Sequence, residues 1–267
     1  MLVLNPGTSA SAAYFAPLAR SIVAAAPGWQ VWAVERRENL LEDQSMFDRA
    51  KAGKATPQQV FDYYLGWIKN SSVTSHVRLI PDSEVGYARQ WGMNVEIGDL
   101  RRVVLRAQKL GGKVVVGGHS LGGSITAAYA TWDFAGKAGA KGLSGLVFID
   151  GGSSPTSITE ADAQQRLTDL GNGSPWLSFG GIPAPFTGLF NTSGSLSVLL
   201  DPNSPSLGQA SGLLPANIVP SFPVTNIGQY GYALDTETSP PGLVRDSILQ
   251  SMKSFEACGG KKRQDAG

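Results

Sequence analysis

The segment Val114–Gly123 constrains the fold of this chain more than any other part of the sequence. Its three consecutive valines predict a short strand that is covered on both faces of a parallel sheet. A Gly-x-Ser-x-Gly pattern follows, with Gly118 and Gly122 on either side of Ser120. A serine at the apex of a strained turn brings neighbouring backbones so close that only residues without a Cβ fit two positions away. The segment therefore predicts a strand, a sharp turn and a helix.

The residues after Ser120 support this interpretation because apolar side chains recur at helical spacing, at Leu121, Ile125, Ala128 and Trp132. The five-residue pattern alone is weak evidence in a chain with 33 glycines among 267 residues. Its setting between a strand and a helix makes it informative. The alternative is an ordinary turn between strand and helix, in which Ser120 only caps the helix.

Short apolar runs elsewhere predict further strands of the same sheet, at Leu2–Leu4, Gln30–Val34 and Leu146–Ile149. Helices are expected between them, from about Ala10 to Ala25 and from Val95 to Leu110. The second has apolar residues at helical spacing at Ile97, Leu100, Val104 and Ala107. Strands that alternate with helices indicate an α/β fold with parallel strands and right-handed crossovers.

Composition divides the chain into three predicted regions: an α/β core over residues 1–152, a lid or cap over 153–242, and a helix with a frayed polar tail over 243–267. The middle region is rich in proline and glycine yet also in large apolar residues, which predicts a folded but irregular segment. Within the core, residues 40–85 are interpreted as an excursion outside the sheet. A helix at Pro57–Lys69 is expected there, capped by Thr56.

The charges nearly cancel, with 22 Lys and Arg against 21 Asp and Glu, which argues against nucleic acid and anionic membranes as partners. Cys258 is the only cysteine, so the sequence predicts neither an internal disulfide nor a thiolate metal cluster, and no cofactor is expected. No long apolar run or signal peptide is recognisable. A soluble, cytoplasmic chain without stable membrane insertion is therefore expected.

A serine nucleophile needs hydrogen-bond donors for the oxyanion that it creates. The amide of Leu121, at the start of the predicted helix, is the expected first donor. Thr8, in the loop after the first strand, is the expected second, with Ser9 in reserve, although both could instead cap the next helix. Asp150 follows the strand beside Ser120, so both residues are expected at the carboxyl edge of the sheet, where ligands bind in such folds.

The segments Asn5–Thr8 and Gly118–Gly123, together with the strand that ends at Asp150, resemble the α/β-hydrolase superfamily of esterases, lipases and their relatives. The resemblance covers residues 1–152. It implies a mostly parallel sheet with helices on both faces and a lid insertion. It also implies carboxylic-ester hydrolysis through an acyl-enzyme at Ser120, and the apolar lid suggests a small apolar ester as substrate. Asp150 is then either the acid of a catalytic triad or a cap of the following turn.

The chain departs from this family in its histidines, since a catalytic histidine is expected late in the chain and the sequence has only His76 and His119. His119 is interpreted as a packing residue within the elbow, and His76 as a locally bonded residue or a rearranged base. Glu35 and Arg37 either line the pocket or pair at the surface. The simplest interpretation is a partial chain with an incomplete sheet and little activity. The alternative is a hydrolase-like scaffold that binds an apolar ligand or partner without turnover.

Overall fold

The structure is a computed structural model that describes residues 1–152, 157–176, 178–179, 182–183, 186, 188–214, 216 and 219–233. Its internal contacts group the chain into two units. The first, here called the sheet unit, comprises Met1–Leu41 and Ile80–Phe186. The second, here called the helical unit, comprises Glu42–Leu79 and the chain from Thr187 onward. This grouping differs from the predicted boundaries at 152 and 242, because the excursion after the second strand joins the later part of the chain.

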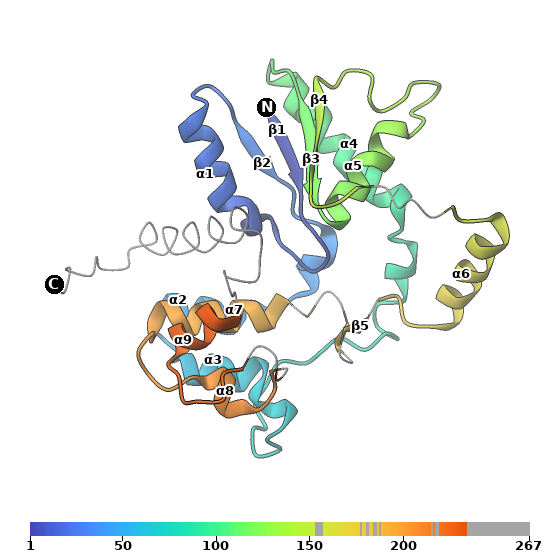
Figure 1. Cartoon of the computed structure of the whole chain (residues 1–267). Helices are drawn as coiled ribbons and strands as arrows, with labels where there is room; N and C mark the ends of the chain where they lie inside the picture. Colours follow the sequence, from blue (N-terminus) through green and yellow to red (C-terminus); the bar gives the residue numbers. More distant parts are fainter. Residues whose placement is uncertain are drawn as a thin grey trace. The chain divides into compact units, whose positions relative to one another are not determined.

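The sheet unit contains a parallel four-stranded sheet among the described residues, with strand order β2-β1-β3-β4 (Figure 1). The predicted α/β fold class is confirmed. The second strand is shorter than the predicted Gln30–Val34. The strands are β1 (Leu2–Asn5), β2 (Val31–Ala33), β3 (Val115–His119) and β4 (Gly145–Ile149).

The strand register brings the loops that matter here to one edge of the sheet. Asn5 pairs with Gly118, and His119 pairs with Ile149. The carboxyl ends of β1, β3 and β4 are therefore level with one another. The chain leaves this edge through Pro6, Ser120 and Asp150, as the sequence predicted for the last two.

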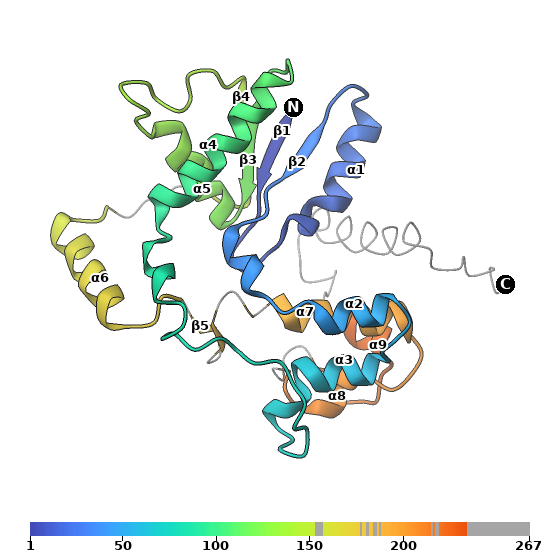
Figure 2. The same ribbon diagram turned by 180° about the vertical axis from the view of Figure 1, so that it is seen from behind.

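Helices cover the sheet from both faces (Figures 1 and 2). A short 3₁₀ helix, η1 (Ala12–Phe15), leads into α1 (Ala16–Ala25) on one face, where Leu2, Leu4 and Phe15 form a core. The opposite face carries α4 (Met93–Lys109) and α5 (Leu121–Thr131). All four apolar positions predicted for the first of these helices are buried: Ile97, Leu100, Val104 and Ala107.

Two local predictions in this layer need correction. The first helical turn begins at Ala12 and not at Ala10, because Ser9 has a left-handed backbone with φ of 59°. Leu121, expected on the buried face of its helix, is 36% exposed, because it is the first residue of α5 and lies at the end of the helix where the chain leaves the sheet. Ile125 behind it is buried as predicted.

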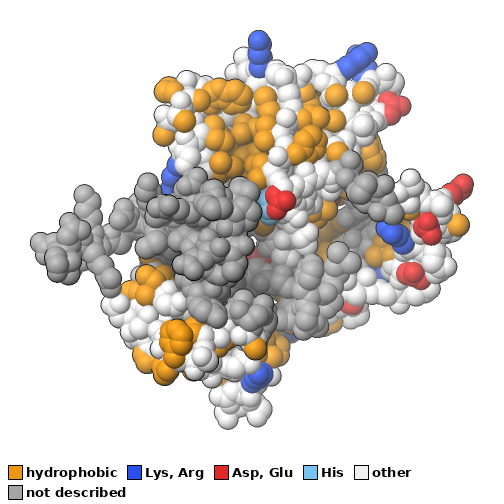
Figure 3. Space-filling model, viewed as in Figure 1, with side chains coloured by type: hydrophobic (Ala, Val, Ile, Leu, Met, Phe, Trp, Pro, Cys, Tyr) orange, Lys and Arg blue, Asp and Glu red, His pale blue; other side chains and the backbone are white. Residues whose placement is uncertain are grey.

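Strand β4 forms one edge of the described sheet and carries apolar side chains on both faces. Val147 and Ile149 pack beside the α1 core, whereas Leu146 and Phe148 point to the other face and are 38% and 48% exposed. Figure 3 shows apolar side chains gathered on the sheet unit, on the side opposite α4. Apolar residues on both faces are typical of strands in the interior of a parallel sheet.

The region after Gly152 is more regular than its composition predicted. In the sheet unit it forms α6 (Glu160–Asn172), whose start has a capping box between Thr159 and Asp162. A short antiparallel pair follows, made of β5 (Ser178–Phe179) and β6 (Ile182–Pro183). Arg89, in the 3₁₀ helix η4 (Gly86–Gln90), donates to the Leu170 carbonyl at 3.0 Å and so ties α6 to the sheet unit.

The helical unit is built from two separate parts of the sequence. The predicted Thr56 cap is confirmed as a capping box with Gln59. Helices α3 and α7 pack together, as do α7 and α9. The prediction of irregular structure is therefore wrong for this stretch, whereas its role as a lid stays a prediction. The predicted helix at 243–255 lies outside the described residues. The helices are α2 (Ser45–Lys51), α3 (Pro57–Tyr64), η3 (Gly66–Ile68), α7 (Gly188–Leu200), α8 (Leu207–Ser211) and α9 (Asn226–Ala233).

Among the described helices, none has the length and apolar character needed to cross a membrane.

Candidate active site

Ser120 lies at the apex of the turn between β3 and α5, in a conformation that serine rarely adopts. Its φ is 51° and its ψ is −117°, and the residue is exposed. Its amide donates to the Ile149 carbonyl at 3.2 Å, which ties the turn to β4. Its side chain makes no capping hydrogen bond to α5, so the alternative of a simple helix cap is not supported. A strained serine at an exposed edge is the backbone geometry expected of a nucleophile elbow, and its role as a nucleophile stays a prediction.

The glycines around Ser120 are required by close backbone contacts. A Cβ on Gly118 would lie 2.2 Å from the carbonyl carbon of Gly122. A Cβ on Gly122 would lie 2.0 Å from the carbonyl oxygen of Asn5 in β1. Both distances are far below van der Waals contact, so the steric prediction for these two positions is confirmed.

Gly151 has the same function but was not predicted. A Cβ on this residue would lie 2.6 Å from Cα of Ser120 and 2.4 Å from its carbonyl oxygen. Next to it, the Gly152 carbonyl accepts a hydrogen bond at 2.5 Å from the hydroxyl of Ser124 in α5. The pair of glycines that follows Asp150, just after β4, was the available signal for this close approach.

The loop after β1 lies directly against the elbow. A Cβ on Gly7 would lie 3.3 Å from Cβ of Ser120 and 2.9 Å from Nδ1 of His119. Thr8 follows this contact and is exposed. The cap position of the first helical turn belongs to Ser11, which makes no side-chain cap bond, so neither Thr8 nor Ser9 takes the capping role that was the alternative.

Two backbone segments that carry amide groups lie next to Ser120. Leu121 is the first residue of α5, and the amides of a first helical turn have no partner within the helix. The positive end of the helix dipole acts at the same point. The Gly7–Thr8 segment supplies amides from the other side. The oxyanion role of Leu121 and Thr8 stays a prediction, which their positions on either side of Ser120 allow.

Asp150 directly follows β4, and like Ser120 it has a left-handed backbone, with φ of 43°. It is exposed at the same edge as Ser120. Its negative charge acts on Tyr14, whose pKa is raised mainly by partial burial and further by Asp150. Tyr14 therefore remains a neutral phenol and a hydrogen-bond donor near this carboxylate at ordinary pH. Tyr14 could not be predicted from the sequence, because it lies in an alanine-rich segment without a recognisable motif.

His119 packs within the elbow, as predicted. Its ring stacks on Tyr14 with centroids 5.1 Å apart, and its Nδ1 is buried without a hydrogen-bond partner among the described residues. His76 belongs to the helical unit, where its ring stacks on Trp67 at 4.5 Å and its Nδ1 bonds the Val77 carbonyl at 2.8 Å. Local bonding, one of the two alternatives for His76, therefore describes its surroundings.

Charged residues after β2 form a network beside the loop that follows β1. The sequence pointed to Glu35 and Arg37 from this group but not to Arg36. Glu35 accepts a hydrogen bond from the amide of Ala12, and Arg37 pairs with Asp99. The ion pair of Arg37 is the surface pairing that was the alternative to pocket lining, whereas Glu35 bonds a backbone amide instead. The residue that reaches the loop is Arg36, whose side chain is buried. No sequence signal distinguished it from its neighbours, because three charged residues surround it.

Glu96 in α4 completes this network, and its pKa is raised to about 7, first by burial and then by the charge of Glu38. Asp99 also raises this pKa, whereas Arg36 and Arg37 lower it. A pKa above the ordinary 4.5 means that the folded state binds the proton more tightly than the unfolded chain. The charge on Glu96 therefore opposes folding.

From this we expect the free energy of unfolding to fall by about 1–2 kcal/mol as pH rises from about 4.5 to 7, allowing for solvent at this partly exposed carboxyl. Glu96→Gln should remove most of that decline, because glutamine does not titrate. Urea unfolding across this pH range measures the effect. Glu160→Gln, on the exposed first turn of α6, is the control and should keep the wild-type slope. An unchanged slope in Glu96→Gln would contradict the assignment.

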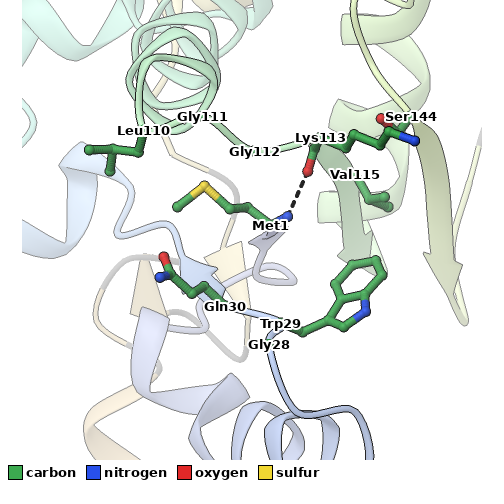
Figure 4. A pocket seen from close by; sticks show the side chains of 10 residues that line it. All are labelled: Met1, Gly28, Trp29, Gln30, Leu110, Gly111, Gly112, Lys113, Val115 and Ser144. Atoms are coloured by element: carbon green, nitrogen blue, oxygen red, sulfur yellow. Dashed lines mark hydrogen bonds between the residues drawn. The ribbon is translucent and has the colours of Figure 1, made fainter.

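One pocket of the sheet unit lies at the opposite edge of the sheet and is not the candidate site. Its volume is about 760 Å³, and it opens around the amino ends of β1, β2 and β3 (Figure 4). The Met1 amino group donates to the Lys113 carbonyl there at 2.6 Å. The lining residues are Met1, Gly28, Trp29, Gln30, Leu110, Gly111, Gly112, Lys113, Val115 and Ser144. No group of three metal-ligating side chains occurs in the part of the chain that the structure describes.

Comparison with known proteins adds no assignment to this geometry: no protein-family model matches the chain, and neither does any curated protein or solved structure.

Proposed function

We propose that this chain is a serine hydrolase of the α/β-hydrolase class, and that it cleaves carboxylic esters through an acyl-enzyme at Ser120. The observation that carries the proposal is the left-handed conformation of Ser120 between two glycines that tolerate no side chain. Such strain persists only where the surrounding structure enforces it, and it is concentrated at functional sites. A small apolar ester remains the proposed substrate.

In the proposed reaction, Oγ of Ser120 attacks the ester carbonyl carbon and the carbonyl electrons move onto its oxygen. The amides of Leu121 and Thr8 hold that oxyanion. When the tetrahedral intermediate collapses, the bond to the alcohol oxygen breaks, that oxygen takes up the proton that Oγ has lost, and Ser120 carries the acyl group. Water then attacks the acyl-enzyme in the same way and releases the acid.

The proton of Ser120 needs a base, and the sheet unit has only His119 among the two histidines of the chain. Because that ring stacks on Tyr14, we do not assign it as the base. Asp150 is proposed as the acid that would orient a base at this edge. Because neither histidine is assigned as the base for Ser120, a second candidate function is also favoured: a hydrolase-like scaffold that binds an apolar ligand without turnover.

Labelling with a fluorophosphonate probe separates these two functions. We expect prolonged exposure to phosphonylate Ser120 in the folded protein and not in protein unfolded in urea, with the site located by peptide mass spectrometry. Added imidazole should accelerate labelling, because it supplies the missing base. A folded protein that stays unlabelled at Ser120, with and without imidazole, would support the scaffold and contradict the hydrolase.

A further inference from the structure

Arg36 reaches from the end of β2 to the loop that carries the proposed oxyanion donor. The residue is only 4% exposed. Its Nη1 donates to the Pro6 carbonyl and its Nη2 to the Gly7 carbonyl, both at 2.8 Å. Its Nε donates to the carboxylate of Glu38 at 2.5 Å. The planar guanidinium is therefore bonded along two of its edges at once.

Holding two successive carbonyls also fixes the amides that follow them. In a trans peptide the C=O and N–H groups point in opposite directions. With its carbonyl held on Arg36, the peptide from Gly7 to Thr8 must direct the Thr8 N–H away from the guanidinium. The peptide from Pro6 to Gly7 is fixed in the same way. A flip of either peptide would break a charge-assisted hydrogen bond to a buried cation.

The surrounding charges hold the guanidinium in this orientation. Glu38 bonds its Nε, and the partly buried Glu96 in α4 is near enough for the charge of Arg36 to lower the pKa of Glu96. Lysine cannot reproduce the arrangement, because its ammonium is a single point of charge and lacks the planar fork that reaches two carbonyls and a carboxylate together.

We propose that Arg36 is a positioning residue that fixes the Pro6–Gly7–Thr8 loop, so that the Thr8 amide is preset for the oxyanion. This rests on the proposed function of Ser120, since an oxyanion site has a use only in acyl transfer. Preset donors stabilise a transition state without reorganisation during the reaction. Arg36 touches the loop and not the reacting atoms.

The test compares Arg36→Lys with the matched control Arg37→Lys, whose parent residue pairs with Asp99 and lies over the Trp91 ring. We expect the rate of fluorophosphonate labelling at Ser120 to fall about 10-fold or more in Arg36→Lys, because small misplacements of such groups are costly. Arg37→Lys should stay within about 2-fold of wild type. The Thr8 amide resonance in ¹⁵N NMR should shift in Arg36→Lys alone.

Glu38→Gln is the second variant if Arg36→Lys does not fold. It keeps an acceptor for Nε but removes the charge, so we expect the Thr8 resonance to shift in the same direction and labelling to slow about 3-fold. Wild-type rates and an unmoved Thr8 resonance in the folded variants would overturn the role of Arg36 alone. An unlabelled wild type would instead overturn the proposed function, and the Thr8 resonance would still report whether Arg36 holds the loop.

Discussion

Alanine at position 122 is expected to lower the free energy of unfolding of the sheet unit by about 3 kcal/mol or more, or to prevent its folding. The new Cβ would lie 2.0 Å from the Asn5 carbonyl oxygen and 2.8 Å from that of Pro6. The Asn5 backbone cannot move easily, because β1 pairs with β2 on one side and β3 on the other, and the Pro6 carbonyl is held by Arg36. Relief of the clash would have to break this ladder or displace α5.

Gly98→Ala is the matched control for this substitution. Gly98 lies inside α4, and a Cβ on it would meet no heavy atom within 4 Å. Alanine there should raise the free energy of unfolding by about 0.5–1 kcal/mol, since glycine is a poor helix former. Urea unfolding of the two variants beside wild type measures the contrast. If Gly122→Ala were as stable as Gly98→Ala, the close contact at the elbow would be wrong.

The elbow and the strand beside it could be predicted because their signals are local. The glycines at 118 and 122 encode a steric requirement that any strand-to-helix serine turn imposes. Asp150 was placed at the same edge because it directly follows the apolar run Leu146–Ile149, which was predicted as the strand beside the elbow. Helix α4 and its four buried positions were predicted correctly, because a long segment with apolar residues at helical spacing identifies the buried face even when the helix ends are uncertain.

The helical unit could not be predicted because its evidence is not local. Helix α3, from residues 57–64, packs against α7, from residues 188–200. The sequence pattern of either segment does not predict which helix it contacts. The prolines of the predicted lid suggested irregular structure over the whole region. In the structure, Pro202 and Pro205 lie between α7 and α8, where they interrupt no helix. Because the prediction relied on composition, it missed helices such as α6. The capping box of α6 at Thr159 could have been recognised in the sequence.

The site shows the same division. Thr8 and Leu121 could be proposed because their places in the chain follow from the order of strand, loop and helix. Arg36 could not, because β2 has only three residues and such a short strand does not determine which of the following charged side chains turns inward. The identity of a base for Ser120 also remained outside sequence reasoning, since neither histidine has the expected place in the chain.

Ser120→Gly is expected to abolish fluorophosphonate labelling at the elbow while making the protein more stable. Glycine adopts the φ of 51° without the steric cost that serine bears, which is about 1–3 kcal/mol for such conformations. Part of this gain is offset by the greater freedom of glycine in the unfolded chain. The net increase in the free energy of unfolding should be about 1 kcal/mol.

Ser124→Gly provides the comparison, because Ser124 lies within α5 on the next helical turn and has ordinary helical backbone. Its replacement should lower stability by about 1 kcal/mol, through the helix and the lost bond to the Gly152 carbonyl, and should leave Ser120 open to labelling. Opposite changes in stability for two serines four residues apart follow only if the strain is specific to Ser120. A loss of stability in Ser120→Gly comparable to that in Ser124→Gly would show that the elbow is unstrained, and the main support for a nucleophile there would be lost.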